Sequence, residues 1–309
     1  MDIQTNALLS EYTTFRLGGR CQTLINCQTP HQIESLIPSL IERHEDFILI
    51  GGGSNLVVSD DGLPLTVIRY VSPLALLKLN GNDLIISGST ILDHAVKFAL
   101  QNSLQGLNYA SGIPGTIGGA IVGNAGAFGK QVGDYLKSVG VMRKDGVTKE
   151  MTPSELGFSY RHSNLKKTGD IVLWARFALT PGNRKMLQQE RAEILRIRQE
   201  KHPDLKTQPC AGSFFRNIEP TSKAQRRQAA GFFLEEAGVK SFRVGGACIF
   251  EKHANIIIKS DGCKSQDVYK LHLLMANAVR EKFKINLVRE VRFVGKFAGM
   301  ASGRQEWIW

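Results

Sequence analysis

The sequence contains few cysteines, and their arrangement excludes the usual cysteine-based frameworks. The five cysteines are scattered, and no two of them are spaced as C-x-x-C. A disulfide scaffold uses an even set of cysteines, and a structural zinc site uses closely spaced ligand pairs. Among the histidines, His162, His202 and His253 include no pair at the i, i+4 spacing of two ligands on one helix. We therefore expect neither a disulfide framework nor a metal ion.

Long apolar runs and repeats are also missing. No stretch approaches the roughly 18 apolar residues of a membrane span, and the first ten residues have neither the basic region nor the apolar core of a secretion signal. No repeat of fixed period is present. The composition, 42% hydrophobic and 22% charged over 309 residues, is typical of a globular chain with two domains or three small ones. These features predict a cytoplasmic protein that does not contact membranes.

Positive charge is abundant, but only in one part of the chain. Residues 1–150 hold 11 Lys+Arg against 13 Asp+Glu, and residues 151–309 hold 28 against 15, so balances of −2 and +13 make up the net charge of +11. The second part should attract anions, either nucleic acid or a small phosphorylated ligand. Its basic residues are mixed with acidic ones and form no compact basic run, which favours the small ligand over nucleic acid.

Hydrophobic periodicity predicts mixed helices and strands. Helices are expected over 31–44, 91–103, a long charged stretch that ends at Pro203, about 221–237 and 265–283. Strands are expected over 47–51, 83–89, 170–179, 247–259 and 285–295, with a hairpin at the Asp145-Gly146 pair. The change in character before the long helix predicts a domain boundary near residue 183.

Two glycine-rich segments follow predicted strands. "GGGSN" (51–55) could present backbone amides to a phosphate, but Leu56 breaks the dinucleotide-binding fingerprint, and by itself a structural turn explains it better. Residues 106–129 contain eight glycines with Ile113, Ile117, Ile121 and Val122 interleaved, which a flexible linker would not have. Because each glycine in regular structure costs roughly 0.5–1 kcal/mol, so many predict a backbone lying against a large flat or phosphorylated ligand.

Ser213 stands in "CAGSFFRNIEP" (210–220) between small residues and two phenylalanines. A hydrolase nucleophile elbow needs glycine two residues after the serine, and Phe215 occupies that position. The elbow motif of hydrolases therefore does not explain why this serine stands among small residues.

Six motifs together resemble one enzyme family. They are "TTFRLGG" (13–19), "GGGSNLVVSD" (51–60), "ASGIPGTIGGAIVGNAGAFG" (110–129), "FSYRHS" (158–163), "AGSFFRN" (211–217) and "REVRFVG" (289–295). Their order and spacing, over residues 5 to about 297, are similar to those of the UDP-N-acetylenolpyruvoylglucosamine reductases, also called UDP-N-acetylmuramate dehydrogenases. The chain resembles the shorter subtype, which lacks an insertion carrying a substrate-capping tyrosine.

The resemblance implies an α+β fold with an FAD-binding unit of the vanillyl-alcohol-oxidase type. The implied parts are FAD-binding subdomains at 1–70 and 71–182, an α+β UDP-sugar domain at 183–297 and a tail at 298–309. The implied reaction uses NADPH to reduce non-covalently bound FAD, which then reduces the enolpyruvyl group of a UDP-sugar in peptidoglycan precursor synthesis. No nucleic acid partner is implied, and we expect a monomer.

The resemblance also implies roles for individual residues. Arg161 and Glu290 would stabilise negative charge on the substrate carboxylate, a geometry that suits a guanidinium, and Ser213 would donate a proton. Residues implied to bind FAD are Gly51, Gly52, Gly53, Ser54, Asn55, Ile113, Pro114, Gly115, Gly118, Gly119, Asn124 and Gly126. Residues implied to bind the UDP-sugar are Tyr160, Lys201, Asn217 and Lys240.

Two departures and two rival functions remain open. Arg289 replaces the proline that commonly precedes the motif glutamate, and Arg227 stands where a lysine is usual. One rival is a sugar or alcohol oxidase of the same flavin fold, which would be reoxidised rapidly by oxygen. The other is a basic nucleotide- or nucleic-acid-binding protein without catalysis, which would be colourless and would bind nucleic acid with a steep salt dependence.

Overall fold

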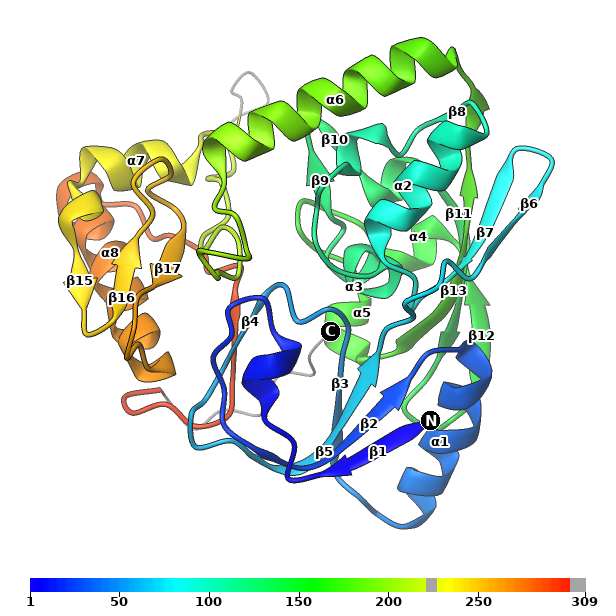
Figure 1. The fold of residues 1–309 in the computed structure, drawn as a ribbon, viewed down its shortest axis with the longest axis horizontal. Helices are drawn as coiled ribbons and strands as arrows, with labels where there is room; N and C mark the ends of the chain where they lie inside the picture. Colours follow the sequence, from blue (N-terminus) through cyan, green and yellow to red (C-terminus); the bar gives the residue numbers. More distant parts are fainter. Residues whose placement is uncertain (221–226, 301–309) are drawn as a thin grey trace.

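The computed structural model describes residues 1–220 and 227–300, and it contains two large sheets, a smaller third sheet and several helices (Figure 1). The first sheet has the order β1-β2-β5-β3, formed by Asp2–Thr5, Cys21–Cys27, Leu63–Tyr70 and Phe47–Ile50. β5 is parallel to both β2 and β3. Helix α1 (Pro30–Glu42) makes the crossover from β2 to β3, and Thr29 and Gln32 close a capping box at its start.

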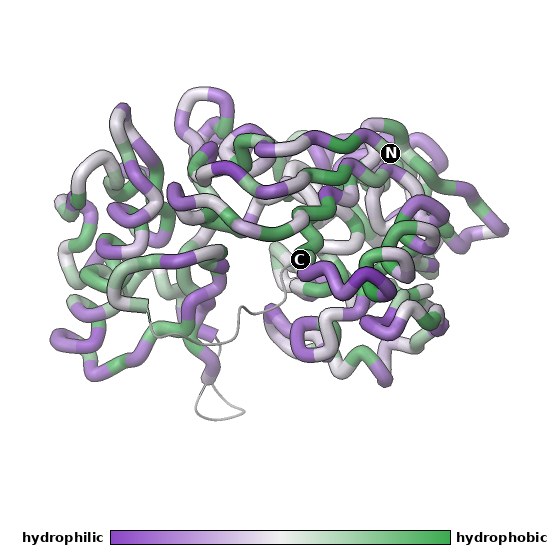
Figure 2. The backbone as a smooth tube through the Cα atoms, turned by 90° about the horizontal axis from the view of Figure 1, so that it is seen from below, coloured by the Kyte–Doolittle hydropathy of each residue, from purple (hydrophilic) through white to green (hydrophobic). Residues whose placement is uncertain are grey.

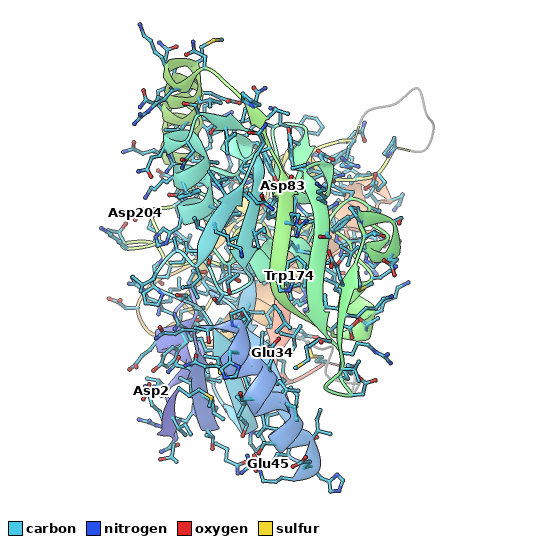
Figure 3. All side chains as sticks on the ribbon, turned by 90° about the vertical axis from the view of Figure 1, so that its right-hand side faces the viewer. Asp2, Glu34, Glu45, Asp83, Trp174 and Asp204 are labelled. Atoms are coloured by element: carbon cyan, nitrogen blue, oxygen red, sulfur yellow. The ribbon has the colours of Figure 1, made fainter. Side chains whose placement is uncertain are left out.

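The second sheet is antiparallel throughout and has the order β12-β11-β13-β7-β6. Its strands are Thr148–Met151, Leu136–Met142, Ile171–Ala178, Asp83–Ser87 and Leu77–Asn80. Gly140 of β11 lies so close to β13 that a Cβ there would come within 2.1 Å of Trp174 Nε1. In Figure 3, Trp174 lies in this sheet above α1, which is marked by Glu34.

A shared apolar cluster joins the first two sheets. It contains Ile33 and Ile37 of α1, Ile68 of β5 and Leu173 of β13, all of them buried. The two sheets therefore fold as neighbours with a common core, and the connections that leave the second sheet carry α2 (Leu92–Gln101) and α3 (Ile117–Val122).

The third sheet belongs to the C-terminal part, which lies beside the larger N-terminal part (Figure 2). It has the order β15-β16-β17 (Arg243–Val244, Ala247–Ile249, Ile257–Lys259), and it is accompanied by α7 (Ala230–Glu236) and α8 (Ser265–Phe283). Its core also takes in Phe15, Leu17 and Val57 from the beginning of the chain. β18 (Arg292–Val294) leaves this part and pairs in parallel with β4 (Leu56–Val58), so the end of the chain returns to the first residues.

The long helix α6 (Arg184–Lys201) runs across the top of the molecule between the two parts (Figure 1). Arg191 holds it against α2 through paired hydrogen bonds to Asp93 at 2.7 and 2.9 Å. Asn108, in the short helix η2 (Asn108–Ala110), donates to Leu187 O and to Glu190.

The remaining elements are short. They are β8 (Leu104–Gln105), β14 (Thr180–Pro181), β9 (Gly126–Ala127), β10 (Lys130–Gln131), α4 (Pro153–Leu156), α5 (Leu165–Thr168), η1 (Leu9–Tyr12), η3 (Val132–Asp134) and η4 (Val239–Ser241).

The predictions for three elements of the C-terminal part need correction. The strand expected over 247–259 is a hairpin, because 250–256 reverses the chain without a glycine or proline to signal the turn. Of the strand expected over 285–295, only β18 is present. Residues 285–291 form a single isolated bridge, between Arg289 and Phe215, and no ladder. The helix expected over 221–237 begins at Ala230, and residues 221–226 lie outside those described.

Candidate active site

A tight turn carries Tyr160 and Arg161. The amides of Ser159 and His162 each donate to the other's carbonyl oxygen at 3.1 Å, so the two residues between them form the turn. Arg161 has φ of 55°, a left-handed conformation that costs a non-glycine residue roughly 1–2 kcal/mol. The hydroxyl of Ser163 donates to Val122 O at 2.8 Å and ties the turn to α3. The surrounding structure therefore holds Arg161 in a conformation that it would not adopt by itself.

The Arg161 guanidinium pairs with Glu290, although the two residues are far apart in the sequence. Arg161 Nε lies 3.0 Å from Glu290 Oε1, and the side chains are 23% and 22% exposed. Arg161 also donates from Nη2 to Gly126 O at 2.8 Å, which fixes the guanidinium against the glycine-rich segment. The structure thus brings together two of the three residues expected to be catalytic.

The Glu290 carboxyl occupies an environment that favours its neutral form. Burial raises the pKa of Glu290 above its usual range, and the charges of Arg161, Lys166 and Arg216 oppose that rise. A carboxyl under these opposing influences can accept or release a proton as the charge nearby changes. Such an arrangement is typical of functional sites.

The segment that carries Ser213 is held next to the segment that carries Glu290. Glu290 N donates to Phe214 O at 2.7 Å, and Phe214 N donates to Asn255 O at 2.8 Å. Phe214 and Phe215 are buried in the core, whereas a Cβ on Gly212 would meet nothing within 4 Å. The phenylalanines therefore anchor the segment, while the space that a side chain at position 212 would occupy is open.

Tyr160 and Asn217 meet at this site. Asn217 N donates to Tyr160 Oη at 3.3 Å, and Asn217 Oδ1 accepts from Ala230 N at 3.2 Å. The guanidinium of Arg227 lies over the Tyr160 ring, 3.7 Å from its centroid, and that of Arg161 lies at 5.1 Å. Two of the four residues expected to bind the UDP-sugar therefore share one cluster with Arg161.

Lys201 and Lys240 form a separate basic cluster with two histidines. Lys201 ends α6, and Lys240 pairs with Glu235 of α7. The rings of His202 and His253 lie 5.7 Å apart between centroids. Burial lowers the pKa of His253, and the charges of Lys201 and Lys240 contribute to the same effect. Burial likewise lowers the pKa of His202 to about 4, so both rings are neutral near pH 7.

The two glycine-rich segments pack against each other. Ser54 Oγ donates to Pro114 O at 3.1 Å. A Cβ on Gly52 would lie 3.2 Å from Gly115 Cα, and one on Gly51 would lie 2.6 Å from Thr116 Oγ1. The structural explanation for the glycines of "GGGSN" is therefore correct in part, because they permit this close approach. The same approach brings the backbone of residues 51–55 next to that of residues 113–116.

The other residues expected to bind FAD lie around α3. Gly118 N donates to Gly88 O at 2.8 Å, Gly119 N donates to the capping oxygen of Thr116, and Ile113 N donates to Ala110 O. Asn124 uses both of its polar groups within the protein, since Nδ2 donates to Ser159 O and Oδ1 accepts from Gly133 N. Asn124 therefore supports the turn that carries Arg161.

Several buried polar atoms in the described residues have no hydrogen-bond partner, and they are not confined to the site, since Asn26 Oδ1, Arg69 Nε and Arg176 Nε are among them. Within the described residues, Tyr109 Oη, Arg198 Nε and Arg216 Nε are buried and have no hydrogen-bond partner. Arg198 lies beside the glycine-rich segment, since a Cβ on Gly112 would be 3.1 Å from its Cδ. Buried polar groups are nearly always paired, so these donors fit a polar or anionic ligand that completes them. The sequence contains no signal for these three residues, because each depends on contacts between distant segments.

Two further findings concern residues 1–220 and 227–300. No group of three or more His, Cys, Asp or Glu side chains there could hold a metal ion. None of the helices in those residues is both long and apolar enough to cross a bilayer.

Two family models match different parts of the chain. Residues 22–152 match the family model of an FAD binding domain, and residues 203–294 match that of the UDP-N-acetylenolpyruvoylglucosamine reductase C-terminal domain. The chain is 35% identical over 291 residues to the UDP-N-acetylenolpyruvoylglucosamine reductase of Caldicellulosiruptor bescii, covering 94% of this chain and 90% of that protein. It is 34% identical to the enzyme of that name from Lactobacillus acidophilus, covering 96% of each.

A solved structure shows the same architecture. The UDP-N-acetylenolpyruvylglucosamine reductase of Thermus caldophilus superposes with a TM-score of 0.78 at 30% identity, over 96% of this chain and all of that one. Because relatives of this identity align over nearly their whole length, the chain belongs to the UDP-N-acetylenolpyruvoylglucosamine reductase family.

Proposed function

We propose that this protein reduces the enolpyruvyl group of UDP-N-acetylglucosamine enolpyruvate to give UDP-N-acetylmuramate, a step of peptidoglycan precursor synthesis. The observation that carries the proposal is the ion pair of Arg161 and Glu290, held between the two glycine-rich segments and the segment of Ser213. A guanidinium and a carboxyl placed together suit a substrate that carries a carboxylate.

FAD and NADPH supply the redox chemistry. When bound, FAD would supply hydride chemistry at the vinyl carbon of the substrate, with NADPH as the source of the reducing equivalents. The backbone of residues 51–55 and 113–116, together with Gly118, Gly119 and Gly126, would hold FAD, because glycines let a flat or phosphorylated group approach the chain. The segment 106–129 contains no histidine or cysteine, so the attachment is non-covalent.

Arg161 and Glu290 act on the charge that hydride addition creates. Addition at the vinyl carbon moves negative charge onto the adjacent carbon and its carboxylate. Arg161 orients this carboxylate and stabilises its developing charge, and Glu290 would donate a hydrogen bond there only in its protonated form, which burial favours. These groups are already held in place, so little reorganisation is needed during the reaction.

Ser213 completes the reaction as an acid. Its Oγ–H donates the proton that quenches the carbanion at the carbon adjacent to the carboxylate. This role explains the absence of a nucleophile elbow, because a proton donor needs no base to activate it. The phenylalanines behind Ser213 fix the position of the hydroxyl donor.

The UDP part would meet two groups of side chains. Tyr160 and Asn217 lie beside Arg161 and suit the part of the substrate near the reacting carbon. Lys201 and Lys240 form the basic cluster and suit the diphosphate.

The subdomains would span residues 1–70 and 71–182, followed by the UDP-sugar domain at 183–297 and the tail from 298, of which residues 301–309 lie outside those described. We infer that the protein is a monomer and that it is located in the cytoplasm. Size-exclusion chromatography with light scattering tests the oligomeric state.

Spectroscopy tests the proposed function. The purified protein should be yellow or become yellow with FAD, NADPH should bleach it anaerobically, and the enolpyruvyl sugar should restore the colour. A bleached protein that is restored rapidly by oxygen and not by the enolpyruvyl sugar would favour the oxidase. A protein that stays colourless with FAD would contradict both.

A further inference from the structure

Lys166 reaches from α5 back to the turn that carries Arg161. Its Nζ donates a hydrogen bond to the Arg161 carbonyl oxygen at 2.8 Å. That carbonyl belongs to the residue whose backbone is left-handed and whose guanidinium pairs with Glu290. The lysine thus acts on the backbone of Arg161, while Gly126 and Glu290 act on its side chain.

The position of this hydrogen bond matters because of the turn geometry. Arg161 is the second of two residues in a turn and has positive φ, a position that normally selects glycine. The direction of a carbonyl is set by ψ of its own residue. A donor fixed on the Arg161 carbonyl therefore opposes the backbone rotation that would return the residue to the right-handed region and turn its side chain away from Glu290.

The stem of Lys166 is itself fixed. Leu165 is fully buried, and the preceding Ser163 is bonded to Val122 of α3. Helix α5 ends at Thr168 and is followed by a left-handed cap at Gly169. Lys166 therefore extends from a rigid base, and its amino group is already in position.

Titratable groups face Lys166 from three segments. Arg161 and His162 come from the turn, Arg216 follows Ser213, and Glu290 and Arg292 come from the segment that ends in β18. Burial lowers the pKa of Lys166 to about 8, with Arg216 and Arg292 adding to the effect and Glu290 opposing it. The ammonium is thus present at neutral pH and is lost as the pH rises through about 8.

We propose that Lys166 is a positioning residue that holds Arg161 in its left-handed conformation and so aims the guanidinium at Glu290 and the substrate carboxylate. The proposal rests on the proposed function for its catalytic consequence. Its structural consequence is independent of that function.

Lys166→Met tests the proposal, with Lys167→Met as the matched control. Lys167 is the exposed neighbour in the same short helix. Lys166→Met should bind FAD and be reduced by NADPH normally, but reoxidation by the enolpyruvyl sugar should slow by about 100-fold, the scale expected when a reacting group is misplaced by about 1 Å. Lys166→Arg, which keeps the donor, should recover most of that rate, and Lys167→Met should match the parent protein.

Two readouts separate positioning from a general loss of stability. A neutral amine donates a weaker hydrogen bond than an ammonium does, so the reoxidation rate of the parent protein should fall in part above about pH 8. This decline should be missing in Lys166→Met and shifted to higher pH in Lys166→Arg. In an Arg161→Ala background, Lys166→Met should have little further effect, because a residue that acts through Arg161 has nothing left to position. An undiminished effect in that background, or a parent rate in Lys166→Met, would overturn the proposal.

The crystal structure of Lys166→Met gives a test that needs no turnover. Arg161 should leave its positive φ, or its Nε should move away from Glu290, and an unchanged turn would overturn the proposal. If the parent protein is not reoxidised by the enolpyruvyl sugar, the proposed function fails while this structural test still stands. If Lys166→Met does not fold, the pH dependence of the reoxidation rate is measured in the parent protein and in Lys166→Arg. A parent rate that does not fall at alkaline pH, together with no shift in Lys166→Arg, would count against the proposal.

Discussion

Asn55 donates a hydrogen bond from Nδ2 to the backbone carbonyl oxygen of Glu290 at 3.1 Å. In return, Arg292 N donates to Asn55 O at 3.0 Å, and the two segments continue as the parallel strands β4 and β18. The turn expected to hold the cofactor and the segment that carries Glu290 therefore form one unit. A ligand held by residues 51–55 lies within reach of the residues that would act on the substrate.

Replacing Ser213 by alanine should separate the two halves of the reaction. Ser213→Ala should still let NADPH bleach the flavin, but reoxidation by the enolpyruvyl sugar should slow by about 10²–10⁴-fold, the usual contribution of a positioned acid. Anaerobic stopped-flow absorbance measures both steps. Ser154→Ala, in the exposed part of α4, is the control. Unchanged reoxidation in Ser213→Ala would remove the serine from the mechanism.

The Glu290 carboxyl should make the protein less stable as the pH rises. Because burial raises its pKa in the folded state, the folded protein binds the proton more tightly than the unfolded chain. The free energy of unfolding should therefore fall as the pH rises from the ordinary value of 4.5 through the folded pKa.

Glu290→Gln removes the proton-binding group and should remove this slope. Its stability relative to the parent protein should therefore increase with pH across the same window, although its reoxidation should be slow. Urea unfolding at a series of pH values measures the difference. Parallel stability curves for the two proteins would contradict the raised pKa.

Gly53 should tolerate no side chain. It has φ of 61°, and a Cβ would lie 2.3 Å from Tyr12 O, so Gly53→Ala carries both a strained backbone and a clash with the main chain. Gly81→Ala is the matched control, since it has φ of 59° and open space around the added carbon. The control should cost about 1–2 kcal/mol, the price of the left-handed conformation alone. Gly53→Ala should cost more and should weaken FAD binding, as measured by urea unfolding and flavin fluorescence.

Asp93 should stabilise the protein above the acid range. Burial raises its pKa, but hydrogen bonds from Arg191 and the Gly112 amide outweigh this and bring the pKa down to about 2 from the ordinary 3.8. The stabilisation is therefore present above pH 3.8 and is lost as the pH falls toward 2. At about 1.4 kcal/mol per pKa unit, Asp93→Asn should cost about 2 kcal/mol at neutral pH.

The control for Asp93 is Glu193→Gln, which removes an exposed ion pair on α6 and should change stability little. The difference between Asp93→Asn and the parent protein should disappear at acid pH. A difference that is the same at pH 2 and pH 7 would mean that Asp93 acts through packing and not through its charge.

Local patterns in the sequence predicted most of the regular elements. The helix expected over 265–283 has the same bounds as α8, and those expected over 31–44 and 91–103 differ from α1 and α2 by one or two residues at each end. The apolar spacing of a helix and the signals at its ends lie within a few neighbouring residues, so they can be read without the rest of the chain. The expected strand over 285–295 failed because a strand needs a partner, and for residues 285–291 the structure provides only one bridge.

The residue types of the site were also visible in the sequence, through motifs that resemble a known family. The sequence did not show that these residues lie close together, because Arg161, Glu290 and Ser213 come from three segments that only the folded chain brings together. The same holds for three further residues. Lys166 donates a hydrogen bond to the Arg161 carbonyl oxygen, and Arg198 Nε and Arg216 Nε are buried without a partner. Arg216 also lowers the pKa of Lys166. Periodicity and motifs are properties of neighbouring residues, whereas burial, ion pairing and an altered pKa depend on which distant residues the packed core places side by side.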